Sequence, residues 1–62
     1  MGDDPKQMLL YYHDGRWTLV WRDNGFLIEG DTDYEALKSR VAEVFLADLD
    51  QVERVKRNPW DR

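Results

Sequence analysis

The sequence predicts an α+β fold in which a three-stranded antiparallel β-meander is followed by one long C-terminal α-helix packed on one sheet face. Two hairpin dipeptides, Asp14-Gly15 and Asn24-Gly25, each lie between residues of high β-propensity. Beyond Gly30, apolar residues recur every three or four positions, which is the spacing of an amphipathic helix. The chain has 62 residues, about half the length of a typical domain, so we expect residues 1–62 to form a single domain.

Both dipeptides are preferred in two-residue type I′ turns, because the two central positions of such a turn take positive φ. Placing the turns there predicts strands near residues 6–13, 16–23 and 26–29, which make up a sheet region over residues 6–29. Residues 1–5 precede the first strand and are expected to be a frayed start.

The two turns also determine which residues share a face of the sheet. They place Trp21 opposite Met8 on one side and opposite Ile28 on the other. Because side chains alternate along a strand, one face then carries only apolar or aromatic residues: Met8, Leu10, Tyr12, Trp17, Leu19, Trp21, Phe26 and Ile28. The other face is mixed and contains Thr18, Arg22, Glu29, Leu9, Tyr11, Val20 and Leu27.

A helix is predicted over residues 32–57. Thr32 and Glu35 fit a capping box, and the acidic residues around them suit the positive end of the helix dipole. Asn58-Pro59 ends the helix, because proline disfavours helical geometry in the residue before it, and residues 58–62 form a tail. One apolar stripe faces the sheet and contains Leu37, Val41, Val44, Phe45, Leu49 and Val52.

A continuous helix of this length spans about 37 Å, whereas a seven-residue strand spans only about 23 Å, so the helix would extend beyond the sheet. One alternative is a break at Asp50, in which residues 48–57 form a separate turn of helix. A fourth strand in this region is disfavoured, because Val52 and Val55 are three positions apart rather than two.

Composition restricts the classes of function. With 0 Cys and 1 His, the chain has no thiolate zinc site, no cysteine nucleophile and no multi-histidine metal site. His13 lies beside Asp14 at a hairpin end, and Ser39 faces away from the apolar stripe, so no catalytic group can be assembled. The oxygens of residues 31–35 lack the glycine and glutamate of an EF-hand loop, so they indicate helix capping. We therefore expect no enzyme activity and no cofactor or metal.

Charge and hydropathy bear on partners and location. The net charge is −4, and residues 1–50 hold 5 Lys/Arg against 11 Asp/Glu, which opposes nucleic-acid binding. Residues 51–62 hold 4 Lys/Arg against 2 Asp/Glu and form a short basic tail. No apolar run approaches the roughly 18 residues of a membrane span, and there is no signal-peptide pattern. We expect a soluble, cytoplasmic protein without a membrane partner.

A homodimer is predicted from the size of the chain and from its apolar surface. A chain this short has a marginal core, and without disulfides or a metal, oligomerisation is the remaining way to stabilise it. The mixed sheet face has no helix of its own, and the helix stripe extends past the strands. The residues predicted to form a dimer or partner interface are Leu9, Tyr11, Val20, Leu27, Phe45, Leu49 and Val52.

Three short motifs resemble one known family. Asp14-Gly15-Arg16-Trp17 leads into a strand, Asn24-Gly25-Phe26 forms a corner, and residues 29–37 read Glu-Gly-Asp-Thr-Asp-Tyr-Glu-Ala-Leu. Over residues 8–46 this is similar to the N-terminal domain of bacterial HicB antitoxins and their solitary small relatives. The family has a Leu-Pro-Gly-Cys-like corner and a Gly-Asp-Thr-x-x-Glu-Ala helix start. The positions that match the family are Gly25, Gly30, Asp31, Thr32, Glu35 and Ala36.

The chain departs from the family at the corner, where Asp23-Asn24 replace Leu-Pro and Phe26 replaces Cys. The resemblance implies a β3α unit that dimerises and binds a toxin or another protein, without the DNA-binding C-terminal domain of complete antitoxins. The expected function is a non-enzymatic, HicB-like protein-interaction module with a small toxin-like partner, related to toxin–antitoxin systems. The alternative is a small nucleic-acid-binding accessory protein that uses the basic C-terminal tail and exposed aromatics.

Overall fold

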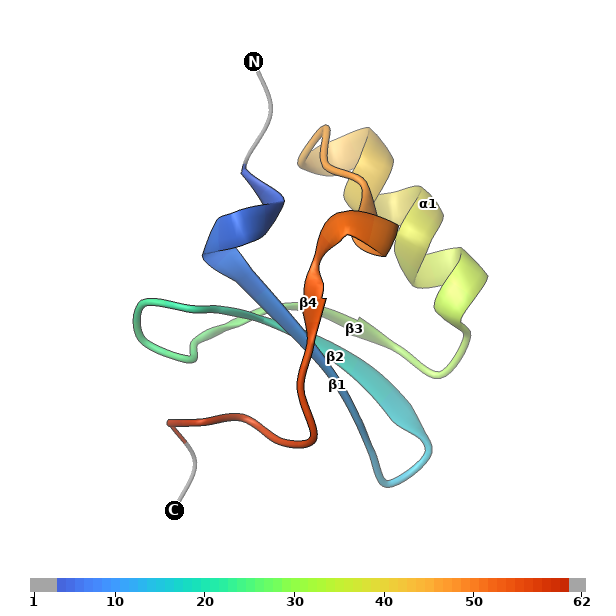
Figure 1. The fold of residues 1–62 in the computed structure, drawn as a ribbon. Helices are drawn as coiled ribbons and strands as arrows, with labels where there is room; N and C mark the ends of the chain where they lie inside the picture. Colours follow the sequence, from blue (N-terminus) through green and yellow to red (C-terminus); the bar gives the residue numbers. More distant parts are fainter. Residues whose placement is uncertain (1–3, 61–62) are drawn as a thin grey trace.

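The computed structural model describes residues 4–60, and it contains one four-stranded mixed sheet and one α-helix (Figure 1). Residues 1–3 of the expected frayed start and residues 61–62 of the expected tail lie outside the described residues. The elements in chain order are the 3₁₀ turn η1 (Pro5–Gln7), β1 (Met8–His13), β2 (Arg16–Trp21), β3 (Leu27–Asp31), α1 (Tyr34–Val44), the 3₁₀ turn η2 (Leu49–Gln51) and β4 (Glu53–Arg54).

The first hairpin has the predicted turn and the predicted register. Asp14 and Gly15 have φ values of 52° and 73°, as a type I′ turn requires. Met8 lies opposite Trp21 and His13 lies opposite Arg16, so β1 and β2 pair antiparallel without irregularity. The register prediction for these two strands is confirmed.

The second turn is longer than predicted, and this shifts the register of β3 against β2. β2 ends at Trp21, and the Gly25 amide donates to the Trp21 carbonyl over 2.8 Å. The carboxamide oxygen of Asn24 accepts from the Phe26 amide at 2.9 Å, which fixes Asn24 in a loop rather than in a two-residue turn. Only Gly25 of the dipeptide has a positive φ, 72°.

The longer turn changes which residues meet across the two strands. Leu19 lies opposite Glu29 and Val20 opposite Leu27, with an irregularity between them. The predicted pair of Trp21 with Ile28 is therefore wrong. Phe26, which was predicted on the apolar face, precedes β3 and is exposed.

The helix begins two residues later than predicted. Asp33 is the N-cap, and its carboxylate accepts from the Glu35 amide at 3.1 Å. The Asp31 carboxylate accepts from the Asp33 amide at 2.9 Å and so positions the cap. Thr32, which was predicted to cap the helix, is an exposed residue between these two carboxylates.

The prediction of one helix over residues 32–57 is wrong, because α1 ends at Val44. Leu46 has a φ of 55°, a left-handed conformation that a helix cannot continue through. A break was correctly considered as an alternative, but the cap of the following turn is Asp48, whose carboxylate accepts from the Asp50 amide at 3.0 Å. The disfavoured fourth strand forms: β4 lies parallel to β1, in the sheet order β3-β2-β1-β4.

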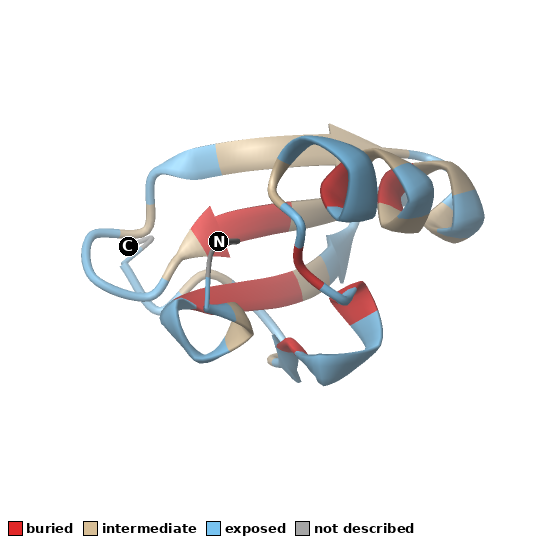
Figure 2. Cartoon of the chain, turned by 90° about the horizontal axis from the view of Figure 1, so that it is seen from above, coloured by how far each residue is buried: buried red, intermediate tan, exposed pale blue. Residues whose placement is uncertain are grey.

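The core lies between the central strands, the inner side of α1 and the segment around η2 (Figure 2). Its buried members are Met8, Leu10, Leu19, Leu37, Val41, Ala47, Leu49 and Val52. Trp21 and Phe45 are half-buried against this cluster. Val44 was predicted in the helix stripe but is 63% exposed, whereas the next residue, Phe45, packs against the core.

Candidate interaction surface

The seven residues predicted for an interface fall into two groups. Leu9, Val20, Leu49 and Val52 are buried within the chain, so a partner could reach them only after the chain opened. Tyr11 and Phe45 are half-buried, and Leu27 is exposed. The structure therefore does not bring the seven together as one free surface, and their role in an interface stays a prediction.

The second face of the sheet is covered in part by the segment that follows β4. Figure 1 shows this segment passing the sheet on the side opposite α1 and ending near the β2–β3 turn. The Asn58 side-chain amide donates to the Gly25 carbonyl over 3.0 Å, and the Trp60 indole N–H donates to the Arg22 carbonyl over 2.9 Å. Within residues 4–60 no helix lies over this face, as predicted, but Leu9 and Val20 are buried there and only Leu27 is largely exposed.

A polar cluster ties the segment around η2 to the helix. The Asp50 carboxylate accepts from the Tyr34 hydroxyl and from the Lys38 ammonium, each at 2.6 Å. The hydrogen bond from Lys38, followed by that from Tyr34, lowers the pKa of Asp50, and the same carboxylate raises the pKa of Lys38. Burial, followed by the hydrogen bond to Asp50, raises the pKa of Tyr34.

One cation of the basic C-terminal region packs against aromatic rings. The Arg54 guanidinium lies 5.1 Å from the ring centre of Trp17 and 5.5 Å from that of Tyr34. These distances are those of cation–π contacts. These contacts link β4 to β2 through Trp17 and to α1 through Tyr34.

Leu46 combines an unusual backbone conformation with an exposed side chain. Its φ of 55° is left-handed, a conformation that favours glycine and costs a branched side chain roughly 1–2 kcal/mol. The residue is 64% exposed, so burial within the chain does not offset this cost. Sequence reasoning missed Leu46, although the residue was visible as an apolar position outside the helix stripe.

A shallow groove of about 520 Å³ lies beside Leu46. Its lining comes from the outer side of α1 and from the residues between α1 and η2, namely Lys38, Ala42, Leu46, Ala47 and Asp48. We call this groove the helix-end surface. It places an apolar projection, Leu46, next to a hollow bounded by two small side chains.

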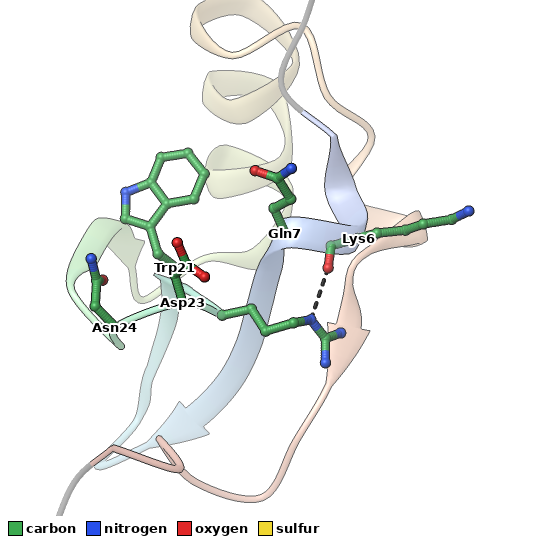
Figure 3. Close-up of a pocket in the computed structure, with 6 residues that line it drawn as sticks. Lys6, Gln7, Trp21, Asp23 and Asn24 are labelled. Atoms are coloured by element: carbon green, nitrogen blue, oxygen red, sulfur yellow. Dashed lines mark hydrogen bonds between the residues drawn. The ribbon is translucent and has the colours of Figure 1, made fainter.

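A second, more enclosed pocket of about 400 Å³ lies near the β2–β3 turn. It is lined by Lys6, Gln7, Trp21, Arg22, Asp23 and Asn24. Figure 3 shows that the side chains of Trp21, Gln7 and Asp23 extend to the same side of the sheet. Sequence reasoning placed Trp21 in the core and so did not predict this pocket.

The His13 imidazole lies 3.2 Å from the Asp14 carboxylate at the tip of the first hairpin, where both side chains are exposed. Within residues 4–60, no three His, Cys, Asp or Glu side chains come together in a way that would hold a metal ion. Of the helical segments in the described part of the chain, none has the length and apolar character needed to cross a membrane.

Comparison with known proteins adds no further assignment. No protein-family model, curated protein or solved structure matches the chain. The resemblance to HicB-like domains therefore depends on the short motifs themselves. Among the residues of these motifs, Gly25 has a positive φ, and the Asp31 carboxylate accepts a hydrogen bond from the amide of Asp33, the N-cap of α1.

Proposed function

We propose that this chain is a non-enzymatic, HicB-like protein-interaction module that works as a homodimer joined through the helix-end surface. The observation that carries the proposal is Leu46, a bulky residue held in a left-handed conformation with its side chain exposed. An outlier of this kind is a reason to look for a function at the same place. Burial of Leu46 against a partner would offset the cost of its backbone conformation.

The helix-end surface also has the features that a two-fold contact between identical chains needs. In such a contact the same patch appears on both sides, so the patch must be complementary to itself, as a projection beside a matching hollow is. Leu46 is the projection, and the space beside Ala42 and Ala47 is the hollow.

The test is sedimentation of the wild-type chain and of Leu46→Gly. Glycine removes the projecting side chain and also relieves the left-handed strain. We expect Leu46→Gly to shift the mass from dimer to monomer, while its monomer becomes more stable towards urea by about 1 kcal/mol. Leu46→Met, which keeps an apolar side chain of similar volume, is the control and should remain dimeric.

The two readouts separate an interface from a purely structural role. If Leu46 had only a structural role, the glycine variant would gain stability with no change of mass. A wild-type chain that sediments as a monomer at its highest soluble concentration would contradict the homodimer. If Leu46→Asp remained a dimer, the interface would lie on another surface of the chain.

The antitoxin-related part of the proposal is supported by the corner at Gly25 and by the motif over residues 30–36. It requires a second protein that binds the chain. The direct test is co-expression with the product of the neighbouring gene, if that gene encodes a small basic protein. Lack of a complex in this experiment would contradict the toxin-partner role and leave the dimer test unaffected.

A further inference from the structure

The pocket near the β2–β3 turn has an aromatic wall that the described residues leave partly exposed. α1 has only 11 residues and lies over one part of the sheet, away from this turn (Figure 2). Trp21, at the end of β2, therefore packs against the core without being fully buried. Its indole instead borders the pocket of about 400 Å³.

The acidic group of the pocket points into it, whereas its two basic groups point away. The Asp23 carboxylate extends on the same side as the Trp21 indole and the Gln7 amide (Figure 3). Among the described residues, Asp23 forms no ion pair and its side chain forms no hydrogen bond. A carboxylate without a partner among the described residues, an aromatic ring and a side-chain amide thus line one hollow.

The two cations that border the same pocket are directed elsewhere. The Arg22 guanidinium donates to the Lys6 carbonyl over 2.8 Å and to the Glu53 carboxylate over 2.6 Å. Figure 3 shows the Lys6 side chain extending away from Trp21. The negative charge of Asp23 is therefore not neutralised by a neighbour inside the pocket.

We infer that this pocket binds an arginine side chain of a partner protein, with the guanidinium on the Trp21 indole and paired with the Asp23 carboxylate. A guanidinium is planar, stacks on aromatic faces and matches a carboxylate with two parallel hydrogen bonds. The Gln7 side-chain oxygen can accept a further N–H. The net charge of −4 attracts a basic partner over a longer range.

The chain already contains an arginine in a comparable setting. Arg54 lies over the rings of Trp17 and Tyr34, and Asp50 lies close enough to hydrogen-bond Tyr34. Around Trp21 the same combination of ring and carboxylate is present, but the arginine that borders the pocket, Arg22, is bound to Lys6 and Glu53 instead. The partner would supply the missing group.

The test uses the pentapeptide acetyl-Gly-Ser-Arg-Ser-Gly-amide as the probe. Binding is followed through the Trp21 indole N–H resonance, which is assigned by its loss in Trp21→Phe. We expect a saturable shift, and we expect Asp23→Asn to weaken binding about tenfold, because the variant keeps the shape and removes the charge. Asp14→Asn, an exposed aspartate in the other turn, is the matched control and should bind like wild type.

Three further peptides carry citrulline, glutamate or lysine in place of arginine. Citrulline has the same shape without the charge and should not bind, and glutamate should not bind either. Lysine should bind more weakly, because its ammonium is not planar. Equal binding of the citrulline peptide, binding of the glutamate peptide, or no saturable shift with arginine would overturn the proposal. A lysine peptide that binds as tightly as arginine would overturn the assignment to arginine.

This inference rests on the proposed interaction function, but the two can fail separately. The pocket shares no residue with the helix-end surface. Leu46→Gly should therefore leave the peptide titration unchanged. A chain that binds the peptide as a monomer would contradict the homodimer alone.

Discussion

Replacing Leu49 by alanine should destabilise the chain severely, although the sequence pattern places Leu49 beyond the sheet. The side chain is 1% exposed and belongs to the central cluster. The substitution removes three carbon groups, a loss of about 2.4 kcal/mol at roughly 0.8 kcal/mol for each. The cavity left behind raises the total to about 3–5 kcal/mol. A chain of this length has only about 3–9 kcal/mol of stability in total.

Leu46→Ala is the matched control, because it makes the same chemical change three positions earlier. Leu46 is 64% exposed, so the change should cost less than about 1 kcal/mol in the monomer. Urea unfolding followed by tryptophan fluorescence measures both variants, at a protein concentration low enough to suppress association. Equal losses in the two variants, or a loss below about 1 kcal/mol in Leu49→Ala, would refute the assignment of Leu49 to the core.

The remaining predictions concern the turns, pH and nucleic acid. Gly25→Ala should destabilise the chain more than Gly15→Ala, although both glycines have a positive φ. A Cβ at residue 25 would lie 2.6 Å from Trp60, whereas a Cβ at residue 15 would lie 3.8 Å from Tyr12. Equal losses of unfolding free energy in urea would contradict the contact with Trp60. The pKa of Asp50 is lowered in the folded chain, so its contribution to folding stability is present above the unfolded pKa of 3.8 and is lost as pH falls through the folded pKa. Asp50→Asn should therefore flatten this part of the curve of stability against pH. Duplex and single-stranded nucleic acids should bind weakly, and tight binding that falls steeply with salt in a filter assay would favour the alternative function.

The sheet was predictable where local signals decide the pairing. The Asp14-Gly15 dipeptide and the residues around it determine the register of β1 and β2. This register does not depend on contacts with residues far away in the sequence. The second turn was predicted only in part, because the Asn24 side chain bonds the backbone of Phe26 and lengthens the loop. A dipeptide rule contains no information about that side-chain hydrogen bond.

The C-terminal third of the fold was not predictable by the same reasoning. No glycine or proline marks the end of α1, and a leucine takes the left-handed position after it. β4 consists of Glu53 and Arg54, two charged residues without any alternation, and it is held by long-range contacts. One of these is the hydrogen bond from the Val55 amide to the Leu10 carbonyl, 2.8 Å long.

The early end of α1 and the formation of β4 explain why the predicted interface residues do not form one free surface. Apolar residues between Phe45 and Val52 were assigned to a partner because a straight helix would carry them past the sheet. In the structure the chain turns back after α1 and uses Leu49 and Val52 in its own core. The exposed apolar residues at the end of the helix are instead Val44, which the helical period places in the stripe, and Leu46, which lies outside it.

The parallel pairing of β1 with β4 has a consequence for biosynthesis. Leu9 and Glu53 are paired but lie 44 positions apart, so β1 is made long before its second neighbour. At about 5–20 residues per second the ribosome needs about 2–9 s to cover this distance, whereas a hairpin such as β1–β2 forms in about 1–10 μs. For seconds, therefore, the outer edge of β1 is without its native strand. During that interval a strand from another nascent chain can pair in the place of β4 and produce exchanged or aggregated products.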